Sequence, residues 1–595
     1  MQEAGVCKIK PEYILPEQER QVNLDCVSDN DKQELSMSRD KREINSNDGD
    51  DGPPAKRQKL SNRAMKKLKG QNKSRGPTFR IAKEQELCNS LVHIVEGEEI
   101  PKCTRNKCQF LHNIEKYLES KPKDIGDTCY NYQTFGICSR GLACRFGSEH
   151  ITQKGKNKID KEKVQTYSVP HTKNQLQHDL QLSLRKKSYN FDLSETLIRY
   201  NDKARESTTS DTKKSLSSKQ GNVTNGAITD EDIIKLQGRE RKVIDWKDKL
   251  FLSPLTTVGN LPFRRICKEF GVDVTCGEMA MCSSLLQGAP QEWALVKRHH
   301  TENIFGVQLC ANNPHLLTKC GQLLQNEIDI DFVDLNLGCP IELVYKQGGG
   351  SGLLRRQKVL ESCIRNLSDI LTVPLTVKTR TGVYNDENIA HILAPKFREW
   401  GASLITVHGR SREQRYTKTA DWQYIKTVVE AAAPLPVLGN GDILSYDDYK
   451  MAKETIPALT GIMIGRGALI KPWIFSEIKE QKLWDISSSE RFDILKKYTN
   501  YGLEHWGSDN KGVENTRRFL LEWLSFLYRY IPVGLLENPP QKINERPPLF
   551  KGRDDLETLM ASPSASDWIK LSEMLLGPVP ENFHFLPKHK ANSYK

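Results

Sequence analysis

Eight short apolar runs of β-strand type, separated by amphipathic stretches of helical type, restrict most strongly how this chain can fold. The runs lie at 250–255, 272–279, 304–310, 332–337, 375–380, 404–410, 436–442 and 462–467. The helical stretches between them lie at 262–270, 292–300, 315–326, 357–370, 387–400, 422–432 and 446–454. Eight such alternations predict an α/β fold, a (β/α)₈ TIM barrel over 244–483. A doubly wound open sheet is the alternative, but it rarely needs eight units in succession.

The chain after the barrel, residues 484–595, has a helical pattern. Phe519, Leu520, Trp523, Leu524 and Leu527 recur at the spacing of one helix face, which predicts an apolar core rather than a binding site. Arg517 and Arg518 adjoin that face. We therefore expect an all-α domain followed by a tail, and we predict that both arginines contact RNA phosphates, with a surface salt bridge as the alternative.

The composition indicates that much of the chain lies outside packed cores. The 595 residues are only 37% hydrophobic, and the mean hydropathy is −0.59. Segments 1–85 and 153–243 are the polar ones, and we expect a disordered arm and a flexible linker there, the linker with short helices such as one near 191–200. Within 53–83 there are eleven Lys and Arg and no acid, in a chain of net charge +12. This stretch is either a solvated tail or an arm for RNA binding or nuclear import.

The cysteine usage indicates a reducing compartment. The chain has 15 cysteines, an odd number, and no signal-peptide pattern or apolar run long enough to span a bilayer. We expect free or metal-bound thiols, a location in cytoplasm and nucleus, no membrane association, and a monomer without an obligate protein partner.

Six of the cysteines gather with two histidines within 86–152. The sets are Cys88, Cys103, Cys108 and His112, and Cys129, Cys138, Cys144 and His150. Three thiolates and one imidazole satisfy Zn²⁺ with no open position, so the expected role is structural. A segment this short cannot bury a core of its own, and metal binding would supply its folding energy.

These two sets resemble CCCH zinc fingers. The spacings within Cys129, Cys138 and Cys144 fit that family well, whereas the gap to His150 and the gap after Cys88 are longer than usual. The resemblance implies binding of single-stranded RNA by stacking on Tyr130, Tyr132, Phe135 and Phe146. The alternative is that these aromatic residues only pack around the metal.

Function in such a barrel gathers where its strands end. Cys339 follows the fourth run in Asn336-Leu337-Gly338-Cys339-Pro340, and a glycine-rich stretch follows at 347–352. A lone cysteine is more often an inert small apolar residue. Its position between a strand end and a proline, before a glycine-rich loop that we expect to be mobile, favours a functional thiol.

Basic and glycine residues follow the later strands. Lys378 ends the fifth run and needs an anionic partner inside an apolar strand. His408 ends the sixth and is equally well explained as a hydrogen-bonded core histidine. The pairs Asn440-Gly441 and Gly465-Arg466 end the last two, where barrel enzymes bind phosphate.

These motifs resemble the tRNA-dihydrouridine synthase family, and with the fingers in front its eukaryotic zinc-finger branch. The matching segments are 253–255, 260–264, Gln308, 336–340, 378–380, 408–410, 440–442 and 465–467, with Leu255 where many relatives have Met.

The resemblance implies an FMN-dependent oxidoreductase that uses NADPH to reduce uridine in tRNA to dihydrouridine, at the variable-loop uridine, with mRNA as a further candidate substrate. Hydride would pass from FMN to C6 of the uracil, and Cys339 would give the proton to C5. The implied FMN contacts are Pro254, Leu255, Thr256, Gln308, Lys378, His408, Asn440, Gly441, Asp442, Gly465 and Arg466. The target base must be unstacked to react.

Two other functions compete with this one. A flavoprotein acting on free pyrimidines, similar to dihydroorotate dehydrogenase, would not need the fingers and basic arms. An RNA-binding protein with an inactive barrel would not need the set Cys339, Lys378 and His408.

Overall fold

The structure is a computed structural model that describes residues 6–16, 81–167, 171–214, 242–414, 416, 418–581 and 583–588, with the side chains of 204–214 left out. The chain forms two compact units. The barrel unit is Val169–Leu483 with Lys542–Asn544. The finger–bundle unit combines Met1–Ser168, Trp484–Gln541 and Glu545–Lys595, so the barrel unit interrupts it in sequence.

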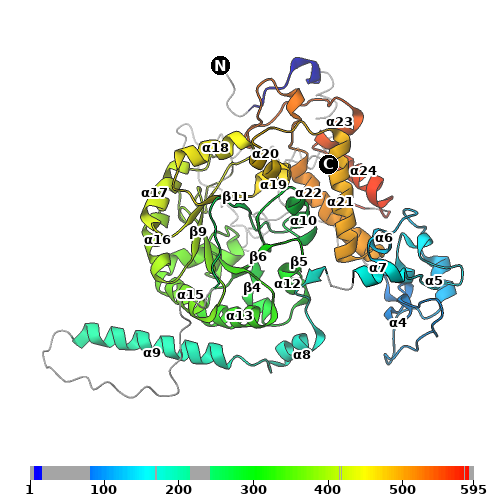
Figure 1. Cartoon of the computed structure of the whole chain (residues 1–595), viewed down its shortest axis with the longest axis horizontal. Coiled ribbons are helices and arrows are strands. Elements are labelled where there is room, and N and C mark those ends of the chain that lie inside the picture. The colour runs from blue at the N-terminus through cyan, green and yellow to red at the C-terminus, as the bar shows by residue number, and fades with distance from the viewer. Residues whose placement is uncertain are drawn as a thin grey trace, which may run out of the picture. The chain divides into compact units, whose positions relative to one another are not determined.

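Eight parallel strands form a closed barrel, as predicted (Figure 1). Their hydrogen-bonded order is β3-β2-β11-β10-β9-β8-β7-β6, and an additional β3–β6 pairing closes the ring. The strands are β2 (Leu250–Leu252), β3 (Val274–Cys276), β6 (Ile304–Cys310), β7 (Phe332–Asn336), β8 (Leu375–Arg380), β9 (Leu404–His408), β10 (Val437–Asn440) and β11 (Gly461–Ile464). Almost every strand residue is buried, which explains why the sequence showed continuous apolar runs.

Helices surround the strands (Figure 1). The longer ones are α10 (Leu261–Glu269), α13 (Pro314–Glu327), α15 (Gln357–Ile370), α16 (Ala390–Glu399), α17 (Trp422–Ala432), α18 (Tyr446–Thr455) and α20 (Ile474–Glu480). Shorter elements are β4 (Ala280–Met281), α11 (Cys282–Leu285), α12 (Pro290–Trp293), η6 (Ala294–Val296), α14 (Glu342–Lys346), η7 (Gly350–Arg355) and α19 (Arg466–Ile470). Side-chain caps begin several of them; Asn260 accepts from the Phe263 N–H and Ser445 forms a capping box with Asp448.

Large apolar side chains fill the end of the barrel where its strands begin. Trp246, just before β2, packs on Phe251 and Phe332 with ring centroids 5.7 and 5.5 Å apart, in a buried cluster with Leu404 and Leu438. This end is closed by packing, so polar chemistry is left to the opposite rim, where the strands end.

The helix expected over 292–300 is only partly present. It ends after α12 and η6, and β5 (Arg298–His299) follows. β5 pairs antiparallel with β1 (Thr172–Lys173), which joins Thr172 to His299. A strand partner from far earlier in the sequence therefore overrides the local helical pattern.

Part of the expected linker is folded onto the barrel. α8 (His178–Lys186) and α9 (Asp192–Lys214) follow β1, and α9 packs on α13 and α15. Ser194, fully buried, donates to Gln322, and Asn201 donates to Asn366. The flexible-linker prediction is therefore wrong for 171–214, although the helix expected near 191–200 is present within α9; residues 168–170 and 215–241 lie outside the described residues.

The finger–bundle unit contains the expected C-terminal helices: α21 (Ser488–Trp506), α22 (Asn510–Leu527), α23 (Asp555–Ala561) and α24 (Ala565–Leu576), with η8 (Val533–Leu535) between them. Leu520, Trp523, Leu524 and Leu527 are buried, which confirms the predicted apolar face at four of its five positions; Phe519 is half-buried and stacks on Trp506. The finger segment contributes η2 (Lys83–Gln85), α4 (Asn89–Val92), α5 (Ile114–Ser120), α6 (Tyr130–Phe135), η3 (Gly141–Ala143), η4 (Gly147–Glu149) and α7 (Lys161–Thr166).

A short N-terminal segment is ordered, contrary to the expectation for 1–85. Residues 6–16, with η1 (Pro11–Tyr13), bridge to Arg546, Leu536 and Phe550. Cys7 and Ile9 are buried in a cluster with Ile531 and Leu535. The basic stretch 53–80 and the rest of 17–80 lie outside the described residues. Among the described residues, no helix is both long and apolar enough to cross a membrane.

Candidate active site and cysteine–histidine clusters

The register of the strands brings the predicted site residues to one rim of the barrel. Asn336 at the end of β7 pairs with Lys378 of β8, and His408 of β9 pairs with Asn440 of β10. Gln308 lies on β6, opposite Asp334 of β7. Because the strands are parallel, their carboxyl ends meet at the same rim, and side chains far apart in sequence become neighbours.

Cys339 is held by its neighbours rather than free in a mobile loop. The side-chain oxygen of Asn336 accepts from the N–H groups of Gly338 and Cys339, at 3.1 and 2.9 Å. Ser351 donates to the Cys339 carbonyl at 2.8 Å, and Arg380 Nε donates to the Gly338 carbonyl at 2.7 Å. The turn that carries Cys339 is therefore braced, and Ser351 of the glycine-rich stretch expected to be mobile takes part in the bracing.

Glycine is required beside the thiol at position 350. Gly350 has φ +54°, and a Cβ there would lie 3.0 Å from the Cys339 Cβ. The thiol is 8% exposed, packed against Cys310, Val344 and Met281. Burial raises the pKa of Cys339, while the backbone at Ile341 and the charge of Arg380 lower it. At neutral pH the group is thus a thiol, able to give a proton.

Gln308 and Asn336 belong to one buried hydrogen-bond chain. Asn336 donates to Gln308 Oε1 at 2.8 Å, and Gln308 Nε2 donates to Asp334 at 2.7 Å. Thr376 donates to the other oxygen of Asp334 at 2.6 Å. Each end of the Gln308 amide keeps a second bonding position, since NH₂ has two donors and the oxygen two lone pairs. The amide is oriented before any ligand arrives.

Four cationic side chains gather around His408: Lys378, Arg380, Arg410 and Arg466. Burial and these charges lower the pKa of His408 well below its usual value, so its imidazole is neutral. Burial and Arg380 lower the pKa of Lys378 to about 8. The only side-chain hydrogen bond described for the Lys378 ammonium is a long one of 3.4 Å, to Asn440 Oδ1.

Asp442 is the one carboxylate described as pairing with this group of cations. It binds Arg410 at 2.6 Å and Arg466 at 2.7 Å, and it accepts from the N–H of Ala420 at 2.7 Å. Arg466 also lies over the ring of Tyr416, 4.0 Å from its centroid. Four cations face Asp442 and, near Lys378, the buried Asp334, so the cationic side chains outnumber the carboxylates at this rim.

The loops predicted to contact FMN through their backbone lie beside that charge. β2 pairs with β11, and a Cβ at Gly465 would lie 3.5 Å from the Ser253 Cβ, so the loop of Pro254, Leu255 and exposed Thr256 adjoins Gly465. Gly441 has φ +155°, and a Cβ there would lie 2.4 Å from the Ala420 Cβ. Net positive charge and close backbone approach fit an anionic, phosphate-bearing cofactor such as FMN.

The first cysteine–histidine set comes together in the finger segment. The ligand atoms of Cys88, Cys103, Cys108 and His112 all lie within 4.8 Å of one another. Cys88 Sγ is 3.6 Å from Cys103 Sγ and 3.8 Å from Cys108 Sγ. Tetrahedral Zn–S bonds of ~2.3 Å place sulfur atoms about 3.8 Å apart, so the spacing fits zinc.

The second set, Cys129, Cys138, Cys144 and His150, also converges within 4.8 Å, and all four residues are buried. Cys144 Sγ is 3.7 Å from Cys129 Sγ. His150 Nε2 is buried, and no residue that the structure describes forms a hydrogen bond with it. A buried imidazole nitrogen without a partner is costly, and a metal ion would satisfy it.

Comparison with known proteins shows which family this chain is similar to. A family described as "Dihydrouridine synthase (Dus)" matches residues 251–525. A "tRNA-dihydrouridine(47) synthase [NAD(P)(+)]-like" protein of Xenopus tropicalis is 51% identical, covering 99% of this chain and 96% of its own. The Homo sapiens protein of the same name is 52% identical over 89% of this chain and 85% of its own. A Coprinopsis cinerea relative is 38% identical over 99% and 98%.

The chain belongs to the dihydrouridine synthase family. The sequence resemblance is therefore confirmed, and so is the barrel fold of the family. The family match begins at β2 and runs into α22, so it covers the barrel and the first half of the helical bundle.

The rim that carries Cys339 also includes residues whose roles the sequence did not predict. Arg380 braces the Cys339 turn, and Arg410, fully buried, anchors Asp442. Arg380 and Arg410 lie in the matching segments 378–380 and 408–410, but the sequence predicts a role there only for Lys378 and His408. For Asp334 the sequence offers one indication, its place in an apolar strand. Burying a carboxylate there costs free energy unless it is hydrogen-bonded.

Arg517 corrects a prediction. It is fully buried, and its guanidinium donates to Ser572 Oγ and to the carbonyls of Leu576 and Gly577, while pairing with Glu514. It joins α22 to the end of α24, and in this arrangement it cannot reach an RNA phosphate. Arg518 is only half-buried, and its RNA contact stays a prediction.

The aromatic residues of the second finger, predicted to stack on RNA bases, mostly contact other residues of the protein. Phe146 is buried, Tyr132 lies 5.5 Å from the His150 ring, and Tyr130 lies 6.4 Å from Phe135 and from Tyr501 of α21. These contacts favour the packing interpretation for Phe146. Base stacking stays a prediction for the half-buried Tyr130, Tyr132 and Phe135.

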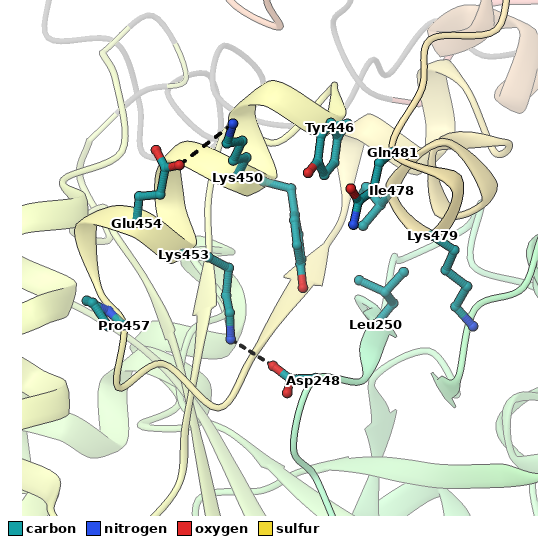
Figure 2. Close-up of a pocket in the computed structure, with 11 residues that line it drawn as sticks. Asp248, Leu250, Tyr446, Lys450, Lys453, Glu454, Pro457, Ile478, Lys479 and Gln481 are labelled. Atoms are coloured by element: carbon teal, nitrogen blue, oxygen red, sulfur yellow. Dashed lines mark hydrogen bonds and ion pairs between the residues drawn. The ribbon is translucent and has the colours of Figure 1, made fainter.

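An open pocket of about 570 Å³ lies elsewhere on the barrel unit, between α18, α20 and the residues before β2 (Figure 2). Ion pairs join Lys453 to Asp248 and Lys450 to Glu454 at its wall. None of the predicted site residues lines it. It is therefore distinct from the rim that carries Cys339.

Proposed function

We propose that this chain is a tRNA-dihydrouridine synthase that reduces the C5–C6 double bond of the uridine at position 47, the site printed in its relatives' names, with NADPH as reductant. The observation that most supports this proposal is the Cys339 thiol, which is braced, protonated and located on the positively charged rim. The same side chain, Asn336, fixes both the thiol's turn and Gln308, so acid and ring-binding group are positioned together.

FMN fits the charge and close backbone approach of the rim, and when bound it would supply the hydride for C6 of the uracil. Gln308 would hydrogen-bond the flavin ring, the loop of Pro254 would line the flavin through its backbone, and the loops of Gly441, Gly465 and Arg466 would hold the phosphate side. Lys378 would stabilise negative charge near the ring. This lysine loses its charge as the pH rises through about 8.

Cys339 would give a proton to C5 as charge develops there. Burial keeps the thiol protonated beforehand. Once the proton has left, the Ile341 backbone and Arg380 stabilise the thiolate, because both favour the charged form. A solvent proton then restores the thiol, so each turnover consumes one hydride equivalent and one proton per uracil.

We further propose that both cysteine–histidine sets bind structural Zn²⁺. The sulfur spacings and the partnerless His150 nitrogen support this assignment. The fingers and α22 would then present the RNA to the barrel, and the target base must leave its stack to reach Cys339. A barrel acting on free pyrimidines would not need these RNA-binding parts.

The test of the proposal uses tRNA that lacks dihydrouridine, with product measured by mass spectrometry. Cys339→Ala should reduce the rate of product formation by about 10²- to 10⁴-fold, the usual contribution of a general acid. Cys310→Ala is the matched control, since Cys310 is a buried neighbour in the same cluster. Flavin content, read from absorbance, should be equal in all three proteins. Normal product formation by Cys339→Ala would refute the proton-donor role.

A further inference from the structure

Three histidines converge at the point where the chain enters the barrel unit. His171 precedes β1, and His299 and His300 lie at the end of β5. Each offers one ring nitrogen, and these atoms all lie within 4.8 Å of one another. His171 Nδ1 is 3.0 Å from His300 Nδ1, and the His299 ring centroid is 4.2 Å from that of His300.

The backbone builds this cluster. The β1–β5 pairing places Thr172 opposite His299, and the His300 N–H donates to the His171 carbonyl at 2.9 Å. The His299 N–H donates to the buried carboxylate of Glu302 at 2.9 Å. The three imidazoles are therefore brought together by fixed main chain, not by three flexible surface side chains.

The ring chemistry suits a transition-metal cation. His299 Nδ1 lies 2.8 Å from Thr301 Oγ1, and that partner would hold its tautomer with the opposite nitrogen open to a ligand. His299 is buried, and a neutral imidazole is the form that binds metal. Tetrahedral Zn–N bonds of ~2.05 Å place nitrogen atoms about 3.3 Å apart, close to the observed separation.

The surrounding charges are largely compensated. Arg264 pairs with Glu302 at 2.7 Å, and Arg298 pairs with Asp331 at 2.7 Å and Asp329 at 3.0 Å. Arg265 also faces His299. The ligand set itself contains no carboxylate, which disfavours Ca²⁺ and Mg²⁺ and favours a cation that accepts imidazole.

We propose that His171, His299 and His300 form a third metal site, which binds Zn²⁺ through three imidazoles and leaves a fourth position for water. His300 is exposed, so solvent can reach that position. β6 begins just after His300 and runs away from it toward the rim that carries Cys339, which makes this site separate from the active site. Its consequence would be to fasten the chain segment that follows the fingers to the start of the barrel.

Metal counting on the full-length chain tests the proposal. Proteins are equilibrated with the same buffered Zn²⁺ and the bound zinc is measured by elemental mass spectrometry. Wild type should hold one equivalent more per chain than His300→Ala or His171→Ala. His315→Ala, which removes an exposed histidine of α13 outside the cluster, should hold as much as wild type.

Cobalt substitution separates metal loss from misfolding. The two cysteine sets give sulfur-to-cobalt charge-transfer absorption, which a site made only of nitrogen ligands lacks. His300→Ala should keep that absorption unchanged while losing one equivalent of bound Co²⁺. Equal metal content in wild type and His300→Ala would overturn the proposal and leave a plain His171–His300 hydrogen bond.

Discussion

The two cysteine–histidine sets have the same ligand types, three cysteines and one histidine, but they differ in burial and in the residues that surround them. In the first, only Cys88 is buried, and the set packs on residues of the finger segment such as Leu91, Tyr117 and Leu142. In the second, every ligand is buried, and the set lies against the C-terminal helices. Cys138 Sγ is 3.3 Å from Ser508 Oγ, and Arg145 donates to Asn510 at 2.6 Å.

This difference separates two tasks for one motif. Around the first set, metal binding would order residues of the finger segment itself. Around the second, it would hold a joint between segments that are far apart in sequence, because Arg145 N–H also donates to the Ser508 carbonyl at 2.8 Å and Arg140 to the Trp506 carbonyl at 3.1 Å. The neighbours of a metal site, not its ligands, decide how far its influence reaches.

The largest effect is expected from Cys144→Ser. Apparent zinc binding energies of about 10–16 kcal/mol contribute directly to folding in such segments. We expect one zinc equivalent to be lost and amide hydrogen exchange to accelerate both within 124–150 and at the start of α22, near Ser508 and Asn510. Unchanged exchange in α22 would contradict the joint.

Cys103→Ser should have a smaller reach. It also removes one zinc equivalent, but exchange should accelerate around 86–118 and at the packed residues Leu142 and Ile151, not in α22, because the first set contacts residues of the finger segment. A chelator added to either single variant should then release the remaining zinc and produce the effect of the other. Acceleration in α22 from Cys103→Ser alone would erase the distinction between the sets.

Arg145→Ala tests the joint without touching a ligand. The guanidinium donates to Asn510 and to the Lys123 carbonyl, so its loss should destabilise the finger–bundle unit by about 1–3 kcal/mol while zinc content stays constant. Arg105→Ala is the matched control beside the first set, where Arg105 only lies 6.0 Å from the Phe110 ring centroid. Denaturant unfolding gives both values, and equal values would count against the joint.

The smallest effect is expected from Arg518→Ala on α22, the helix against which the second set packs. Loss of one phosphate contact should weaken tRNA binding modestly and reduce the slope of affinity against salt by about 1. Arg517→Ala should instead lower stability, because its guanidinium bonds buried carbonyls. Affinity measured at several salt concentrations distinguishes the two, and an unchanged slope for Arg518→Ala would remove the predicted contact.

The sequence predicted the barrel well because its strands are buried on both faces and appear as continuous apolar runs. The ends of these strands then located Cys339, Lys378 and His408 correctly at one rim. The convergence of the two predicted cysteine–histidine sets is confirmed, and the sequence could predict it because it depends on local spacing; that they bind zinc stays a prediction.

The failures all involve partners distant in sequence. The 292–300 stretch has a helical pattern, but its end forms the strand β5 because it pairs with β1. The segment 171–214 is polar enough to suggest a linker, yet Ser194 and Asn201 find buried partners on the barrel. Arg517 stands beside an apolar helix face, and only the position of α24 shows that carbonyls already occupy its guanidinium.

The division of the finger–bundle unit has a consequence for the order of events during synthesis. The fingers leave the ribosome first, but the helices that cover the second set follow only after Val169–Leu483. Translating roughly 300 intervening residues takes about 15 to 60 s. During that interval the nascent second finger has no bundle to cover it, whereas the barrel can close as soon as its last strand emerges. The eight barrel strands would thus be complete before the finger–bundle unit can assemble.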